Sequence, residues 1–301
     1  MDGGRASVDA ARLDSGLAAQ ASAFEAYTRK AAAIDANFSG PAEIGQALQT
    51  AAGYEPKQLE AGMIAYAALA ALQNPQFVAT VRRGGPDLGR RLAYDPDASL
   101  DLPGGPAAAA RAAAALAKRG EALADAGARV KKAAYSVQHQ AWSRARIPDA
   151  PQRLAGVKRI SAVGYRADPG DRARLTAALA EGGRSGGQSP VVAKGLTVAA
   201  LTVLGQDGPA RSLMSEPKSG MCLRTAKLNF HQCLAAAGTH YEDIYCLGLH
   251  AMADTGRCVK GALEPPDVDT KLSPSLIAAS TTGGAAPAVS SGPLSVAPLA
   301  Q

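Results

Sequence analysis

Four cysteines constrain the fold of this chain more than any other feature, because all of them fall in one short segment. Cys222, Cys233, Cys246 and Cys258 lie almost symmetrically about Gly238-Thr239-His240. Cys222 and Cys233 are eleven residues apart, so at about 100° per residue they fall within about 20° of each other on a helix. Both side chains would therefore face the same neighbouring element.

The residues between the two halves of this segment predict a turn between two helices. Gly238 suits a left-handed helix C-cap. Thr239 and Glu242 fit the Thr-x-x-Glu capping box that opens a second helix, and Asp254-Thr255-Gly256 is expected to end that helix. Residues 219–258 are thus predicted to form a tight antiparallel helical hairpin.

The hairpin also predicts how the cysteines pair. Cys233 would lie opposite Cys246 near the turn, and Cys222 opposite Cys258 at the far end. Two nested disulfides follow, each stabilising the fold by roughly 3 kcal/mol through loop closure. The arrangement is similar to the twin Cys-x9-Cys helical hairpins of small proteins from oxidising compartments. Here the spacings are ten and eleven, and the similarity covers this segment alone, so it indicates shared geometry rather than membership of that family.

The cysteine usage bears on the compartment. An even number of cysteines within one segment favours a disulfide framework over scattered core thiols, and disulfides persist in oxidising compartments. We therefore expect a periplasmic or exported protein. The N-terminal residues show no basic start followed by an apolar run, so we expect that a signal peptide has been lost from this version of the sequence. The alternative is a cytoplasmic protein with reduced thiols.

Composition narrows the fold class and the partners. The chain is 47% hydrophobic but only 4% aromatic, so its core must consist largely of Ala, Leu and Val, which favours closely packed helices.

No segment reaches the roughly twenty apolar residues of a membrane span, so a transmembrane protein is not expected. A net charge of +6 permits contact with nucleic acid, anionic lipid or acidic polysaccharide. The basic stretch 144–174 has only one aromatic residue, Tyr165, and so lacks the series of aromatics that would stack bases, which makes nucleic acid an unlikely partner.

Two heptad seams predict long helices in the first half of the chain. The first seam gives a helix of about thirty residues. The second runs along a helix expected over 106–146, in which small residues follow the large ones and allow a close approach to another helix, most plausibly the N-terminal one. These seams also allow a homo-oligomer. The first seam is Leu13, Leu17, Gln20, Phe24, Tyr27, Ala31, Ile34 and Phe38, and the second is Leu116, Leu123, Val130 and Val137 with Gly120, Gly127, Ala134 and Ala141.

These elements predict an all-α protein with four parts. Residues 1–181 form a long-helix bundle domain, with an irregular connection over 84–105, and residues 182–190 form a Gly/Ser-rich flexible linker. Residues 191–260 form the cysteine-containing helical hairpin module, in which the helix 191–204 is expected to cover one face of the hairpin. Residues 261–301 form a tail rich in Pro, Ala, Ser and Gly, which we expect to be disordered.

Few residues are candidates for chemistry. Ser185 lies in a Gly-x-Ser-x-Gly pattern, but within a glycine-rich linker and not on the strand-to-helix turn that a serine hydrolase requires. A zinc site is the alternative. Its ligands would be Cys246 and His250, which are four residues apart, together with His231 and Cys233. A Cys246/His250 nucleophile pair conflicts with disulfide formation. We predict no catalytic residues, no metal site and no cofactor.

We expect a non-enzymatic scaffold or adaptor of the bacterial cell envelope, because the sequence lacks catalytic motifs and has heptad seams and a cysteine framework. Its partner would be a protein or an envelope polymer. Two alternatives remain. One is an enzyme that acts on envelope polymers, and the other is a cytoplasmic zinc-binding module that contacts nucleic acid.

Overall fold

The computed structural model describes residues 15–180 and 188–265. Within these ranges the chain is helical and forms no strand; a single β-bridge joins Arg146 and Thr239. The all-α prediction is confirmed. None of the described helices combines the length and the apolar character needed to cross a membrane.

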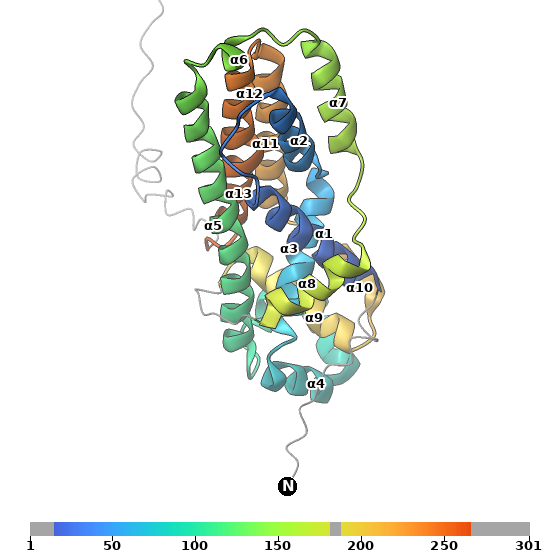
Figure 1. The fold of residues 1–301 in the computed structure, drawn as a ribbon. Coiled ribbons are helices and arrows are strands. Elements are labelled where there is room, and N and C mark those ends of the chain that lie inside the picture. Colours follow the sequence, from blue (N-terminus) through green and yellow to red (C-terminus); the bar gives the residue numbers. More distant parts are fainter. Residues whose placement is uncertain (1–14, 181–187, 266–301) are drawn as a thin grey trace, which may run out of the picture. The chain divides into compact units, whose positions relative to one another are not determined.

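Short connections join the helices along the chain (Figure 1). Two segments depart from α-helical geometry: η2 is a 3₁₀ helix and η3 is a π-helix. The elements are α1 (Ser15–Ala32), α2 (Pro41–Ala52), α3 (Pro56–Ala71), α4 (Pro75–Tyr94), η2 (Pro96–Ser99), α5 (Gly105–Val137), α6 (Ala141–Arg144), α7 (Ala150–Ala162), α8 (Pro169–Ala180), α9 (Pro190–Val203), α10 (Asp207–Ser212), α11 (Pro217–Ala236), α12 (His240–Cys246), η3 (Leu247–Asp254) and α13 (Thr255–Gly261).

Proline and a preceding cap explain where several of these helices begin. Proline is favoured in the first turn, because its missing N–H would have no helical partner there and its φ is already helical. The residue before it supplies a side-chain oxygen to the free amides of the first turn. This pattern opens α3, α4, α9 and α11, whose caps are Glu55, Asn74, Ser189 and Glu216.

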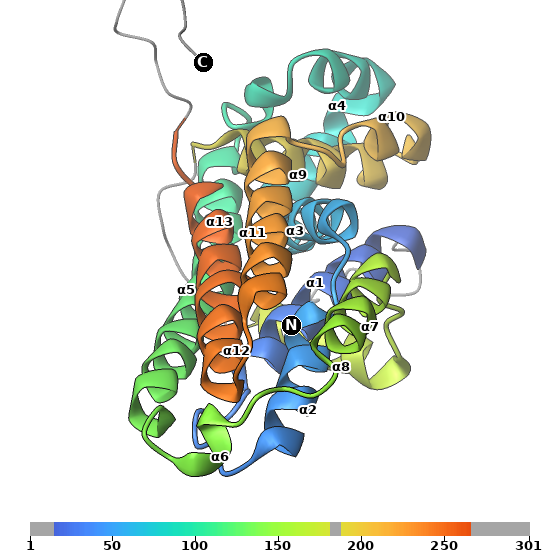
Figure 2. The same ribbon diagram turned by 90° about the horizontal axis from the view of Figure 1, so that it is seen from above.

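Helix α3 is the centre of the core. Its residues from Gly62 to Ala71 are all buried, and it packs against α1, α5, α9 and α11 (Figures 1 and 2). A Cβ at Gly62 would lie 2.7 Å from the carbonyl oxygen of Gln20. Six of its sixteen residues are alanine, and a Cβ at Gly195 of α9 would lie 2.7 Å from the Cβ of Ala67, so α1 and α9 both approach this helix closely.

The hydrophobic core is continuous from α1 to α13, and the described residues belong to one compact unit that ends at Pro265. Helix α9 packs chiefly against α3, so the expectation that residues 191–204 cover the hairpin is wrong. The predicted division of the chain at 182–190 stays a prediction. Residues 181–187 of that linker, with Ser185, and residues 266–301 of the predicted tail lie outside the described part.

Two predicted helices are shorter than expected, and one predicted irregular connection is mostly helical. Helix α1 ends at Ala32, short of Phe38, although Phe24, Tyr27 and Phe38 are buried as the seam requires. Helix α5 ends at Val137. The connection expected over 84–105 is mostly helical, because α4 resumes after a kink at Gly85, whose φ of 61° is accessible to glycine.

Candidate functional site

The four cysteines form two disulfides that join α11 to the helical segment α12–η3–α13. Cys222 pairs with Cys258 and Cys233 with Cys246, which are the pairs that the spacing predicts, and each pair has a Cα–Cα distance of 5.6 Å. The antiparallel, disulfide-stapled hairpin is therefore confirmed. Cys222 is exposed to solvent, whereas Cys246 and Cys258 are buried.

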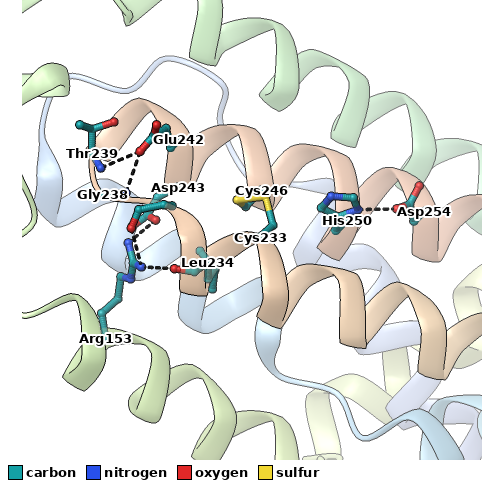
Figure 3. The surroundings of a disulfide bond; sticks show 11 residues. Arg153, Cys233, Leu234, Gly238, Thr239, Glu242, Asp243, Cys246, His250 and Asp254 are labelled. Carbon is teal, nitrogen blue, oxygen red and sulfur yellow. Dashed lines mark hydrogen bonds and ion pairs between the residues drawn. A yellow bond between two sulfur atoms is a disulfide. The ribbon is translucent and has the colours of Figure 1, made fainter. Parts of the chain in front are cut away.

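The turn of the hairpin differs in one detail from the prediction. Gly238 does not adopt the left-handed conformation; instead, Ala237, the residue that follows the end of α11, is extended, with φ −68° and ψ 125°. The Glu242 carboxylate accepts hydrogen bonds from the backbone amides of Gly238 at 2.7 Å and Thr239 at 2.9 Å (Figure 3). These bonds satisfy amides at the start of α12 and fix the path of the turn.

Arg153 of α7 holds the turn from the side (Figure 3). Its guanidinium pairs with the carboxylate of Asp243 on α12 and also donates to the carbonyl oxygens of Leu234 and Ala237 at the end of α11. The two charged side chains are 13% and 2% exposed. Burial raises the pKa of Asp243 to about 6, against the opposing effect of Arg153. One arginine thus ties the ends of both hairpin helices to α7.

The second arm of the hairpin packs backbone to backbone against α5. A Cβ at Gly127 would lie 2.6 Å from the carbonyl oxygen of Gly248, and a Cβ at Gly256 would lie 2.7 Å from that of Gly120. The close approach predicted for the glycines of α5 therefore occurs, but the partner is the hairpin and not the N-terminal helix. Figure 2 shows α5 beside α12 and α13.

The π-helix explains how the two glycine pairs stay in register. The glycines are seven residues apart on α5, at Gly120 and Gly127, but eight apart on the hairpin, at Gly248 and Gly256. In an α-helix eight residues rotate about 80° out of line. The wider i→i+5 turns of η3 rotate less per residue, which returns Gly256 to the face of Gly248. The helix continues from η3 directly into α13, so the prediction that it ends at Asp254-Thr255-Gly256 is wrong.

The residues of the alternative zinc site do not converge. Cys233 and Cys246 bond to each other. The Nδ1 atom of His250 lies 2.7 Å from Asp254, and the Nε2 atom of His231 lies 3.4 Å from the hydroxyl of Ser161. Among the described residues no three His, Cys, Asp or Glu side chains are placed to hold one metal ion. The disulfide also occupies the sulfur atom that a Cys246/His250 nucleophile would need.

Sequence reasoning missed a buried lysine on the inner face of α11. Lys227 is 6% exposed, and its Nζ atom donates to the carbonyl oxygen of Ala52 at 3.0 Å and to the Ser161 hydroxyl at 3.1 Å. It also lies 3.4 Å from the centre of the Tyr54 ring. Burial lowers the pKa of Lys227 to about 7, and burial with the nearby charge of Lys227 lowers that of His231 to about 4.

This cluster has the residue types of a serine–lysine catalytic pair, but its hydrogen bonds are structural. The Ser161 hydroxyl donates to Ala52 at 3.0 Å, and the lysine donates to that serine instead of accepting its proton. Ser161 is itself buried. The group closes the C-terminal end of α2 against α7 and α11. The sequence signal was the position of Lys227 between buried Leu223, Phe230 and Leu234 at helical spacing.

A second polar cluster joins α1 to α8. The buried Asp171 carboxylate accepts a hydrogen bond from Arg29 at 2.9 Å and another from the Tyr165 hydroxyl, and Lys30 lies 3.8 Å away. Burial acts to raise the pKa of Asp171, but the hydrogen bonds of Tyr165 and of the Asp168 amide and the two basic side chains lower it. This cluster is another structural contact, since each charge has a partner of opposite sign.

Comparison of this chain with protein-family models, with curated proteins and with solved structures finds no match.

Proposed function

We propose that this protein is a non-enzymatic helical scaffold or adaptor of the bacterial cell envelope, acting in the periplasm. The observation that carries the proposal is the pair of nested disulfides, Cys222–Cys258 and Cys233–Cys246. Bonds of this kind are stable in oxidising compartments and rare in the cytoplasm.

The polar clusters of the described residues support a role without chemistry. Perturbed ionisable groups are the usual candidates for catalysis. Here Lys227, Asp243 and Asp171 each hold helix ends or neighbouring helices together through hydrogen bonds and ion pairs. A rigid helical body with these contacts suits a protein that positions a partner.

Fractionation of the native host, combined with a turnover assay, tests the proposal. We expect the protein in the periplasmic fraction, and we expect the purified protein to release no soluble fragments from cell-wall sacculi. Enzymatic release of fragments would favour the alternative of an enzyme that acts on envelope polymers. Recovery of the protein in the cytoplasmic fraction would contradict the assigned compartment.

A further inference from the structure

A cavity of about 220 Å³ opens where the turn end of the hairpin meets α5. Tyr135 of α5 lines one side, and Tyr241 and Tyr245 of α12 line the other. The ring of Tyr135 meets that of Tyr245 edge to face, with centroids 6.1 Å apart and an interplanar angle of 89°. These two rings therefore form perpendicular walls of the cavity, which we call the tyrosine pocket.

The charge in the wall of the tyrosine pocket is negative. Of the described residues that line it, only Glu242 carries a charge. The Oε2 atom of Glu242 accepts hydrogen bonds from the backbone amides of Gly238 and Thr239, so the carboxylate is held in place. The faces of aromatic rings also carry a negative potential. A carboxylate beside several aromatic rings favours a cation in the space between them.

The rest of the lining favours a methylated cation over a primary ammonium. A primary ammonium has three N–H donors and a strong hydration shell, and burying it requires hydrogen-bond acceptors on several sides. A quaternary ammonium has no N–H and presents methyl groups instead. Such groups pack on small apolar side chains, and three of the lining residues are alanines: Ala134, Ala236 and Ala237.

The size of the pocket also limits the ligand. Sites for drug-sized molecules measure about 300–1,000 Å³, and the tyrosine pocket is smaller than these. It therefore suits the head of a ligand rather than a whole large molecule.

We propose that the tyrosine pocket binds the quaternary ammonium group of a choline-type ligand. The positive charge lies beside Glu242 and against the tyrosine rings, and the methyl groups pack on the alanines. Free solutes such as choline carry this group, and so does the head group of phosphatidylcholine. The inference goes beyond the proposed function and does not rest on the compartment.

A neighbouring lysine opposes the ligand, and this makes the sign of its charge testable. The Nζ atom of Lys131 lies 5.7 Å from the centre of the Tyr245 ring, and Lys131 is not part of the lining. Its ammonium group repels a bound cation and would attract a bound anion. Lys131→Met should therefore tighten the binding of a cation, whereas it would weaken the binding of an anion.

The hairpin holds the pocket in one conformation. The Cys233–Cys246 disulfide joins α11 to α12, and the Arg153–Asp243 pair fixes the start of α12, next to Glu242 (Figure 3). Rigid side chains lose little conformational entropy on binding. The disulfide and the arginine contacts therefore prepare the site for its ligand.

Titration calorimetry on the full oxidised chain tests this inference. The probes are choline, its neutral isostere dimethylbutanol, in which carbon replaces the nitrogen, and ethanolamine, which has a primary ammonium. We expect choline to bind more tightly than either of the other two. Tyr135→Ala should weaken choline binding about tenfold through the lost cation–π contact. Tyr135 is 53% exposed, so this change removes pocket wall rather than core. Glu242→Gln keeps an oxygen for the capping amides and should also weaken the binding.

Cosedimentation with phosphatidylcholine vesicles distinguishes the two sources of the ligand. Pelleting that is lost in Tyr135→Ala would assign the site to the lipid head group. Choline binding without pelleting would assign it to a free solute. Both outcomes support a quaternary ammonium site.

Tyr94→Ala is the matched control, because Tyr94 is 94% exposed on α4 and does not line the pocket; it should leave the affinity for choline unchanged. Four outcomes would each overturn the inference: no binding of choline at millimolar concentration, equal affinity for dimethylbutanol, weaker binding in Lys131→Met, or the same loss in the Tyr94 variant. The host fractionation tests only the compartment, so the two proposals can fail separately.

Discussion

Arg153 contacts both helices of the hairpin at its turn. Its guanidinium bonds to Asp243 and to two carbonyl oxygens at the end of α11. Removing one partner of a buried ion pair leaves the other charge without compensation, which typically costs about 3–5 kcal/mol. We expect Arg153→Met to lower the free energy of unfolding by about 3 kcal/mol, measured by urea denaturation.

Arg90 supplies the control for this substitution. It pairs with Asp87 on the surface of α4, where the two side chains are 75% and 85% exposed, and exposed pairs contribute little to stability. Arg90→Met should leave the urea midpoint nearly unchanged. Equal midpoints for the two variants would show that the Arg153 contacts do not hold the turn.

Lys227 predicts a pH dependence of stability. Its pKa is about 7 in the folded protein and near 10.5 when unfolded, so the unfolded state binds more protons between these values. Stability should therefore rise from pH 7 to 9 by up to about 1.4 kcal/mol per pH unit from this group. In Lys227→Met that rise should disappear, while Lys158→Met, at an exposed position on the neighbouring helix, should keep it. Urea denaturation across this pH range measures the difference, and an unchanged slope in Lys227→Met would contradict the assignment.

At the scale of elements, the contact between α5 and the hairpin depends on glycine. A Cβ at position 127 would meet the backbone at Ala253 and at Gly248, and backbone cannot move aside as a flexible side chain can. We expect Gly127→Ala to destabilise the protein by about 1–3 kcal/mol through overpacking, measured as a shift of the thermal midpoint.

Gly156→Ala in α7 is the matched substitution. The nearest atom to its added Cβ is the end of the Arg159 side chain at 3.9 Å, so alanine should fit and stabilise the helix by about 1 kcal/mol. A loss of stability in both variants would mean that the close approach of α5 and the hairpin is not the cause.

Element types and the hairpin were predictable because their signals are local. Glu242 lies three residues from Thr239, and all four cysteines lie within residues 222–258. The glycines at 120 and 127 predicted a close contact but not its partner, which depends on how distant segments pack. The π-helix was not predictable for the same reason: η3 aligns two glycine pairs that only meet in the folded chain. The Lys227 and Asp171 clusters also bring together residues from separate helices.

At the scale of the whole molecule, the disulfides close the hairpin on a continuous core. They link α11 to the segment that lies along α5, and α5 in turn packs against α1 and α3. Loop closure of this kind stabilises the native state by about 3 kcal/mol for the shorter loop and about 4 kcal/mol for the longer one. The disulfides of the hairpin therefore contribute to the stability of the whole fold.

The central claim is that the hairpin is oxidised in the living cell, and the thiol state of the protein in its native host tests it most directly. Cells are quenched in acid, and the protein is denatured with an alkylating agent so that buried and exposed cysteines react alike. Intact mass is then measured before and after reduction. We expect no alkyl groups without reductant and four after reduction, one for each cysteine. Four alkyl groups without reductant would contradict both the disulfides and the envelope assignment.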